Sequence, residues 1–84
     1  MNKDEIFNEV KLIINDRLDI EKNEITLDKT LQDMKADSLD SVEVIMEVEK
    51  VFDIAIPDKD MEKFSNIQSI VDYVYNHIPV EKRS

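Results

Sequence analysis

The chain has 84 residues, 42% of them hydrophobic, which suffices for one small domain with a single core over residues 1–84. It contains no cysteine and no glycine, which excludes disulfides, thiolate metal sites and the glycine-rich loops that cradle nucleotide phosphates. Twenty acidic against eleven basic residues give a net charge of −9, which disfavours nucleic acid and anionic membranes and favours a basic protein partner.

The first predicted element is an amphipathic helix over residues 4–18. Asn2 precedes it, and Glu5 three residues later completes the pattern of a capping box. Apolar residues recur at helical spacing at Ile6, Val10, Ile13, Ile14 and Leu18. Residues 19–37 then mix polar and isolated apolar residues, which predicts a long loop held to the core by its own side chains. These side chains are Ile25, Leu27, Leu31 and Met34.

A second helix is predicted over residues 38–52, where helical spacing resumes. Residues 53–57 follow this helix and end with Pro57, which disfavours helical backbone at the residue before it. We expect Asp58 to cap a single short helix that ends near Lys63.

The last predicted helix begins after Ser65, which forms a capping-box pattern with Gln68. Its apolar stripe continues until Pro79 stops it. The stripe consists of Ile67, Ile70, Val71, Val74 and Ile78. We expect residues 79–84 to be a frayed tail, so the chain has three longer helices and one short helix.

The helix predicted over residues 38–52 has two apolar faces. At 100° per residue, one broad stripe faces the core and contains Val44, Ile45, Val48, Val51 and Phe52. The opposite side holds a smaller apolar strip, which consists of Leu39, Val42 and Met46. Carboxylates edge this strip, and a hydrophobic centre with a charged rim is typical of transient interfaces. Ordinary exposed hydrophobic residues are the alternative explanation.

Negative charge is concentrated around the same helix. Residues 36–62 contain nine acids and two bases, which is −7 of the net −9. Exposed carboxylates in this arrangement give fast, salt-sensitive association rather than tight binding. The charge therefore predicts a basic partner that binds and leaves quickly.

Several function classes find no support in the residues. His77 is the single histidine, so a zinc site lacks its usual imidazoles. A serine-hydrolase site lacks the Gly-x-Ser-x-Gly elbow and oxyanion donors, and His77 is far from Ser38 in the sequence. The dense aspartates do not form a calcium-binding loop, because the central glycine and the twelfth-position glutamate are missing. No apolar run approaches a membrane span and no secretory signal is present, so we expect a cytoplasmic monomer without catalytic activity or membrane insertion.

The most informative segment is residues 35–43, which place one hydroxyl, that of Ser38, at a loop-to-helix junction between the carboxylates of Asp37 and Asp40. It resembles the attachment site of bacterial fatty-acid-type acyl carrier proteins. Two further blocks resemble the same family, at residues 52–58 (Phe-Asp-Ile-Ala-Ile-Pro-Asp) and 67–74 (Ile-Gln-Ser-Ile-Val-Asp-Tyr-Val).

The resemblance implies a small all-α four-helix bundle in which Ser38 carries 4′-phosphopantetheine and shuttles acyl groups as thioesters in fatty-acid biosynthesis. It implies attachment by a phosphopantetheinyl transferase that uses coenzyme A and Mg²⁺, with Asp37 and Asp40 engaging that enzyme. It also implies that acyl chains can enter between the helices. The recognition surface for basic partner enzymes would be Leu39, Val42, Met46 and Ile56, with Glu43 and Glu47.

The chain departs from the family pattern at three places. Lys35 stands where glycine is frequent, which adds a cation and removes backbone freedom beside the attachment site. Ile54 and Ala55 stand where polar residues are common, and Lys50 interrupts the acidic run. These differences affect the choice of partner rather than the attachment.

Other functions stay open at this point. Ser38 could simply cap the helix that begins there, since serine is favoured at that position. The carrier could serve polyketide, nonribosomal peptide, lipid A or D-alanyl transfer pathways, although Asp40 and the Val42-Glu43 pair favour the fatty-acid type. An unmodified helical adaptor is the alternative of another class.

Overall fold

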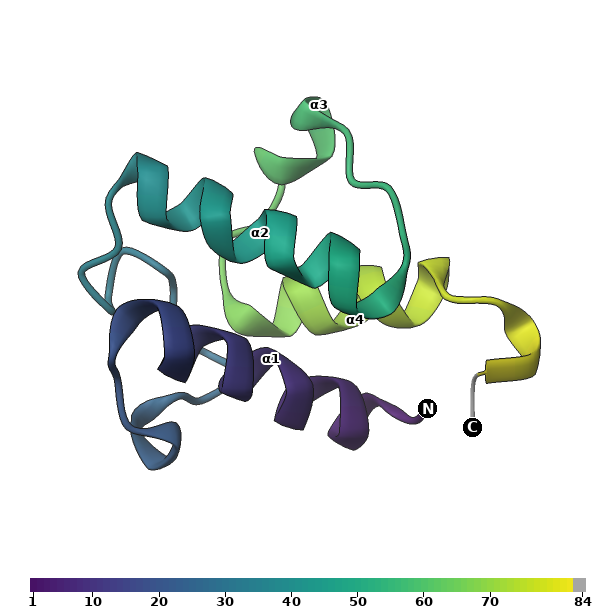
Figure 1. The fold of residues 1–84 in the computed structure, drawn as a ribbon, viewed down its shortest axis with the longest axis horizontal. Coiled ribbons are helices and arrows are strands. Elements are labelled where there is room, and N and C mark those ends of the chain that lie inside the picture. Colours follow the sequence, from purple (N-terminus) through teal and green to yellow (C-terminus); the bar gives the residue numbers. More distant parts are fainter. Residues whose placement is uncertain (83–84) are drawn as a thin grey trace.

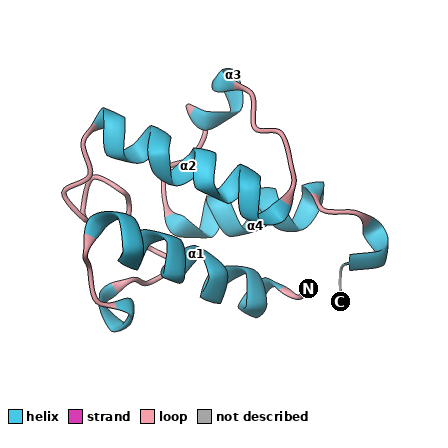
Figure 2. Ribbon diagram, viewed as in Figure 1, coloured by secondary structure: helices cyan, strands magenta, loops and turns pink. Residues whose placement is uncertain are grey.

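The computed structural model describes residues 1–82, which fold into helices joined by loops (Figure 1). The three long helices are α1 (Lys3–Leu18), α2 (Ser38–Phe52) and α4 (Ile67–His77), and the short one is α3 (Asp58–Met61). Two 3-10 helices, η1 (Lys22–Glu24) and η2 (Val80–Lys82), lie in the first loop and after α4. No strand occurs within residues 1–82 (Figure 2), and the predicted all-α bundle of three longer helices and one short helix is confirmed.

Helix α1 packs against both α2 and α4 and runs in the opposite direction to each (Figure 1). The three helices meet through side chains that are almost completely buried, including Val10, Ile14, Val44, Val48, Ile70 and Val74. Burying one such side chain stabilises the fold by about 1.5–3 kcal/mol relative to leaving it exposed. The shared core therefore holds α1 against both of its neighbours.

The predicted start of α1 is confirmed in detail. Asn2 Oδ1 accepts a hydrogen bond from the Glu5 backbone N–H at 2.8 Å, and Glu5 Oε1 accepts one from the Asn2 N–H at 3.0 Å. These two bonds form the capping box and satisfy two N–H groups that the helix itself cannot. The helix buries Ile6, Val10, Ile13 and Ile14, and Leu18, the last residue of the predicted stripe, packs partly buried against the core.

The loop between α1 and α2 is tied to the beginning of α4. The backbone N–H of Ile67 donates to the Lys29 carbonyl at 2.9 Å, and the N–H of Gln68 donates to the Leu27 carbonyl at 2.9 Å. The four apolar side chains predicted to hold the loop also lie in or against the core, with Ile25 and Met34 buried and Leu27 and Leu31 partly buried. The predicted packing of the loop is confirmed.

Helix α2 matches its predicted range, and four of its five predicted core residues are buried. Val51 is the exception, with 44% of its surface exposed. The buried residues Val44, Ile45, Val48 and Phe52 span an arc of about 100°, and Val51 lies about 20° beyond its edge on the same wheel. The prediction that Val51 faces the core is wrong for this reason.

The predicted cap and end of the short helix α3 are wrong. Pro57, and not Asp58, occupies the N-cap of α3, and the helix ends at Met61 rather than near Lys63. Asp58 is the first residue inside the helix, where an acidic side chain still favours the positive end of the helix dipole.

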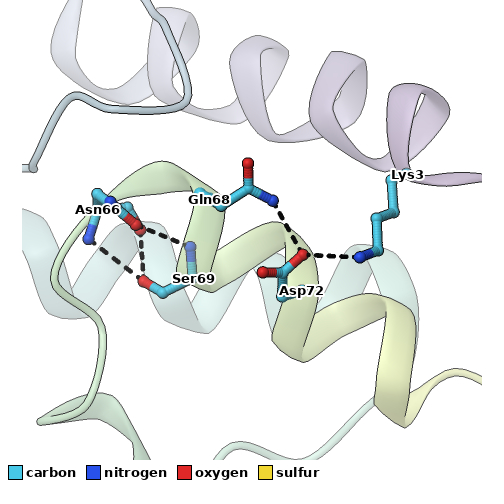
Figure 3. A network of polar contacts seen from close by, with 5 residues as sticks. All are labelled: Lys3, Asn66, Gln68, Ser69 and Asp72. Carbon is cyan, nitrogen blue, oxygen red and sulfur yellow. Dashed lines mark hydrogen bonds and ion pairs between the residues drawn. The ribbon is translucent and has the colours of Figure 1, made fainter.

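Helix α4 is capped one residue later than predicted, by Asn66 and Ser69 (Figure 3). Asn66 Oδ1 accepts from the Ser69 N–H at 2.9 Å, and Ser69 Oγ accepts from the Asn66 N–H at 3.2 Å. Gln68 instead donates its side-chain amide to Asp72, which also pairs with Lys3 of α1 at 3.1 Å. The reciprocal bonds of Asn66 and Ser69 replace the predicted box.

The apolar stripe of α4 is buried over its whole predicted length, at Ile67, Ile70, Val71, Val74 and Ile78. In the described part of the predicted tail, Val80–Lys82 form η2 at the surface, with the Lys82 N–H donating to the Pro79 carbonyl at 2.8 Å. Residues 83–84 of the predicted frayed tail lie outside the described residues.

The cap of α4 gives a direct test of this local structure. Asn66→Ala removes the acceptor for the Ser69 N–H, so we expect the free energy of unfolding to fall by about 1 kcal/mol. Urea unfolding followed by circular dichroism measures this change. Ser65→Ala is the matched control and should stay within about 0.5 kcal/mol of the wild type. A larger loss in Ser65→Ala than in Asn66→Ala would contradict the observed cap.

Candidate functional site

Ser38 is the first residue of α2, and its side chain is exposed. The N-cap is Asp37, whose Oδ1 accepts from the Asp40 N–H at 2.8 Å, while its carbonyl accepts from the Ser41 N–H at 3.0 Å. The alternative in which Ser38 caps the helix is therefore wrong. Within residues 1–82 the Ser38 hydroxyl has no hydrogen-bond partner, so it is available for chemistry at a fixed point of the surface.

A hollow of about 550 Å³ opens beside Ser38. Its walls come from the first loop, from α2, from the end of α3 and from the segment that joins α3 to α4. Polar side chains also line it, at Thr30, Gln32, Ser41, Glu62 and Ser65. Ile45 is nearly inaccessible, with 3% of its surface exposed, and the partly buried side chains around the hollow are mostly apolar. The apolar lining is Leu31, Val42, Ile45, Met61 and Phe64. The hydroxyl thus lies at the rim of a space that suits an alkyl or other apolar group.

A larger hollow, of about 800 Å³, lies between the end of α1 and the first loop. Asp40 and Lys35 reach it, but Ser38 does not. Its lining carries both signs of charge, from Arg17 and Lys29 as well as from Glu24 and Asp33. The hydroxyl and the apolar hollow therefore form the candidate site, and this mixed-charge hollow is separate from it.

A polar contact holds the α3 side of the apolar hollow in place. The Tyr73 hydroxyl of α4 donates to Asp60 Oδ2 of α3 at 2.9 Å, and the Phe64 ring meets Tyr73 edge-on with centroids 5.3 Å apart. This hydrogen bond lowers the pKa of the Asp60 carboxyl below its ordinary value. Burial, followed by the contact with Asp60, raises the pKa of the Tyr73 hydroxyl. Both shifts favour the hydrogen-bonded pair near neutral pH.

The backbone just before the site adopts a conformation that favours glycine. Lys35 has a φ of 62°, in the left-handed region, and its N–H donates to the Gln32 carbonyl at 3.0 Å. Ala36, which follows, is buried and donates to the Leu31 carbonyl at 3.0 Å. A side chain at this φ costs free energy, so Lys35 is strained where glycine would not be.

The apolar strip of α2 is exposed, as predicted from the helical wheel. Leu39, Val42 and Met46 have 66%, 42% and 49% of their surfaces exposed. They lie on the side of α2 away from its buried residues. Three large apolar side chains on one exposed helix face suit contact with another molecule.

The carboxylates near the strip differ in their surroundings. Glu43 is exposed, and no ion pair involves it within residues 1–82. Glu47 pairs with Arg17 of α1, with Nη2 and Oε2 3.0 Å apart. Glu49 is partly buried, and its Oε2 accepts a hydrogen bond from the Ile56 N–H at 3.1 Å. Of these three glutamates, only Glu43 is both exposed and without an ion pair or hydrogen bond among the described residues.

Ile56 requires a correction. The resemblance places it on the partner surface, but it is only 4% exposed and belongs to the core. The segment after α2 turns back because Asp53 takes left-handed backbone at φ 55° and Glu49 binds the Ile56 N–H. In this conformation Ile56 belongs to the core and offers no contact surface.

Comparison with known proteins decides the family. The model of the family described as "Phosphopantetheine attachment site" matches residues 8–74. An acyl carrier protein of Guillardia theta is 44% identical over 75 residues, which cover 88% of this chain and 93% of that protein. The chain belongs to the acyl carrier protein family. The prosthetic group of this family is a covalently attached 4′-phosphopantetheine.

Two bacterial relatives give the same result. An acyl carrier protein of Rubrobacter xylanophilus is 41% identical over 78 residues, which cover 92% of this chain and 96% of that protein. An acyl carrier protein of Thermosynechococcus vestitus is 38% identical over 79 residues, which cover 93% of this chain and 98% of that protein. Within residues 1–82, no helix is long and apolar enough to cross a membrane.

Sequence reasoning missed three residues of this region. Met61 and Phe64 line the apolar hollow, and Arg17 pairs with Glu47. Phe64 gave a local signal, since it is an aromatic residue in a polar stretch. Arg17 and Glu47 are 30 residues apart, and nothing in the sequence pattern indicates their contact.

The strain at Lys35 leads to a stability prediction. Lys35→Gly removes the side chain that conflicts with φ 62°, so we expect the free energy of unfolding to rise by about 0.5–1 kcal/mol. Lys35→Ala is the control, because it removes the same charge and keeps the Cβ atom. Urea unfolding measures both variants. An equal gain in both would assign the effect to charge and contradict the backbone explanation.

The contact of Tyr73 with Asp60 predicts a pH dependence. Because the pKa of Asp60 is lowered, its contribution to stability is present above the ordinary value of 3.8 and is lost as the pH falls through the folded pKa. Because the pKa of Tyr73 is raised, its contribution is present below 10.0 and is lost as the pH rises through the folded pKa.

The stability advantage of the wild type over Tyr73→Phe should therefore be widest near neutral pH and should narrow at both extremes. Thermal unfolding across the pH range measures it. The same comparison in an Asp60→Asn background is the control and should show little pH dependence. A constant difference between wild type and Tyr73→Phe at all pH values would refute the role of this hydrogen bond.

Proposed function

We propose that Ser38 is the attachment site of 4′-phosphopantetheine and that this chain carries acyl groups in fatty-acid biosynthesis. The observation that carries the proposal is the hydroxyl of Ser38, exposed at the first position of α2 and at the rim of an apolar hollow. Membership of the acyl carrier protein family supports it. When bound, the prosthetic group supplies a terminal thiol that holds acyl chains as thioesters.

The beginning of α2 fits a phosphodiester on Ser38. The backbone N–H groups of Ser38 and Leu39 have no acceptor within residues 1–82, because the bonds to Asp37 begin with the Asp40 N–H. Free N–H groups and the positive end of the helix dipole favour a negatively charged oxygen there. Ser38 is thus a better site for a phosphate than a serine within the helix.

Attachment needs a second protein, because the chain supplies a nucleophile without a base of its own. Ser38 Oγ would form the new bond to phosphorus and lose its proton, while coenzyme A would release adenosine 3′,5′-bisphosphate. Asp37 and Asp40 lie within one turn of Ser38 and would attract the basic transferase and its Mg²⁺. The chain then serves as substrate of the transferase and not as a catalyst.

The apolar hollow suits the cargo. Its floor at Ile45 and its walls at Met61 and Phe64 would remove an acyl chain from water, at about 0.8 kcal/mol for each buried methylene group. The hollow and Ser38 share one face of the molecule, so a chain held at Ser38 can turn back into it. Protection of the cargo and release to a partner then depend on the same opening.

The surface around Ser38 suits brief contact with basic enzymes of the cytoplasm. The apolar strip of Leu39, Val42 and Met46 would form the centre of the contact. The carboxylates of Asp37, Asp40 and Glu43 lie at the beginning of α2, and Glu47 lies in its middle, where it pairs with Arg17. Ile56 is left out of this surface because it is buried.

Mass measurement tests the attachment. Incubation of the protein with coenzyme A, Mg²⁺ and a broad-specificity phosphopantetheinyl transferase should add the mass of one phosphopantetheine. Ser38→Ala should gain nothing. Ser41→Ala, which removes another hydroxyl at the same hollow, should be modified like the wild type. If a folded wild type that carries no phosphopantetheine beforehand gains no mass, the carrier function is refuted and an unmodified helical adaptor is favoured.

The modified protein then tests the pathway. With purified fatty-acid synthesis enzymes, the thiol should accept a malonyl group and carry it through chain elongation. If phosphopantetheine is attached but no elongation follows, the carrier function stands. The proposed role in fatty-acid synthesis is then rejected in favour of another thioester pathway.

A further inference from the structure

The ion pair between Arg17 and Glu47 joins the last turn of α1 to the middle of α2. Nη2 of Arg17 and Oε2 of Glu47 are 3.0 Å apart, and the side chains keep 38% and 30% of their surfaces exposed. The pair therefore lies at the surface, within reach of a bound partner. On the helical wheel Glu43 lies on the same edge of the strip, one turn before Glu47.

The ion pair reduces the long-range electrostatic attraction that Glu47 exerts on an approaching protein. Opposite charges 3.0 Å apart largely cancel at distances beyond a Debye length, which is about 8 Å at physiological salt. Glu43 is exposed and has no such partner within residues 1–82, so its charge acts over the full distance. Two glutamates of one edge thus contribute unequally to long-range attraction.

The remaining charges of α2 strengthen this difference. Glu49 is partly buried and holds the Ile56 N–H, and Lys50 is an exposed cation one turn after Met46. Asp37, Asp40 and Glu43 lie in the first two turns, next to Ser38, with Lys35 as the one cation among residues 35–43. Attraction for a basic surface is therefore strongest at the beginning of α2.

We propose that Arg17 is a specificity-determining residue, which neutralises Glu47 so that basic partners are drawn to the beginning of α2, beside Ser38. This inference rests on the proposed function, since it concerns the same docking surface. It makes Glu47 part of the carrier's own structure rather than a contact to the partner. A carrier with an unpaired carboxylate at this place would attract basic partners more strongly and along more of the helix.

Binding of charge variants to an immobilised phosphopantetheinyl transferase tests the proposal. Surface plasmon resonance would use the unmodified protein without coenzyme A, at low and high salt. Arg17→Gln exposes the charge of Glu47, so we expect binding about two- to fivefold tighter at low salt, mainly through faster association. Glu47→Gln leaves Arg17 unpaired and should weaken binding by a similar factor. The double variant should return to the wild-type affinity.

Lys82→Gln is the matched control, because it makes the same change in net charge in η2, at the other end of the molecule (Figure 1). Its effect should be clearly smaller than that of Arg17→Gln. A double variant that binds as weakly as Glu47→Gln would show that Glu47 contacts the partner and would overturn the proposal. Equal effects of Arg17→Gln and Lys82→Gln would overturn it too.

Failure of the proposed function gives a different result. If the wild type neither binds the transferase nor gains phosphopantetheine, the proposed function fails, and the proposed docking surface fails with it. A wild type that binds and is modified, with variants that behave otherwise than expected, would leave the carrier function intact and reject only the role of Arg17. Circular dichroism of each variant confirms that the fold is kept.

Discussion

Two backbone hydrogen bonds between the first loop and the beginning of α4 support much of the structure around Ser38. The carbonyls of Leu27 and Lys29 accept the N–H groups of Gln68 and Ile67, which α4 cannot satisfy from within. These bonds join a long loop to a helix some 40 residues further along the chain. The loop then places Leu31 at the hollow and leads the chain into α2. Without this attachment, the position of the site would depend on apolar contacts of the loop alone.

The carboxylates of α2 show how far charge in a sequence differs from charge at a surface. Asp37 caps the helix, Glu49 holds the Ile56 N–H, Glu47 pairs with Arg17, and Glu43 is exposed. The contacts of Glu47 and Glu49 reduce what these two carboxylates offer to a partner, whereas Asp37 and Glu43 stay exposed. The acidic segment is therefore graded along the helix, and the grading follows from neighbours that the sequence alone does not reveal. A docking surface of this kind is shaped as much by α1 and the α2–α3 loop as by α2.

A chain without glycine must form its turns with other residues. Asp19 and Asp53 take left-handed backbone after α1 and α2, each donating its N–H to a carbonyl four residues earlier. Aspartate tolerates this conformation better than most residues because its short polar side chain can bond locally. Lys35 lacks that advantage and carries strain next to Ser38.

The sequence by itself determined the three long helices, most of their buried residues and the position of Ser38 at the beginning of α2. Helical periodicity identified the buried stripes of α1 and α4 and the exposed strip of α2, because side-chain spacing directly reflects which face is apolar. The capping box at Asn2 was equally readable, since its two residues are local. At α4 a candidate pair one residue away misled the prediction, because several polar residues compete for one cap. Only the tertiary structure decided that Ile56 is buried, that Arg17 meets Glu47 and that Met61 and Phe64 line the hollow. These contacts join residues far apart in the chain, and their formation depends on how helices and loops pack, which no local pattern encodes.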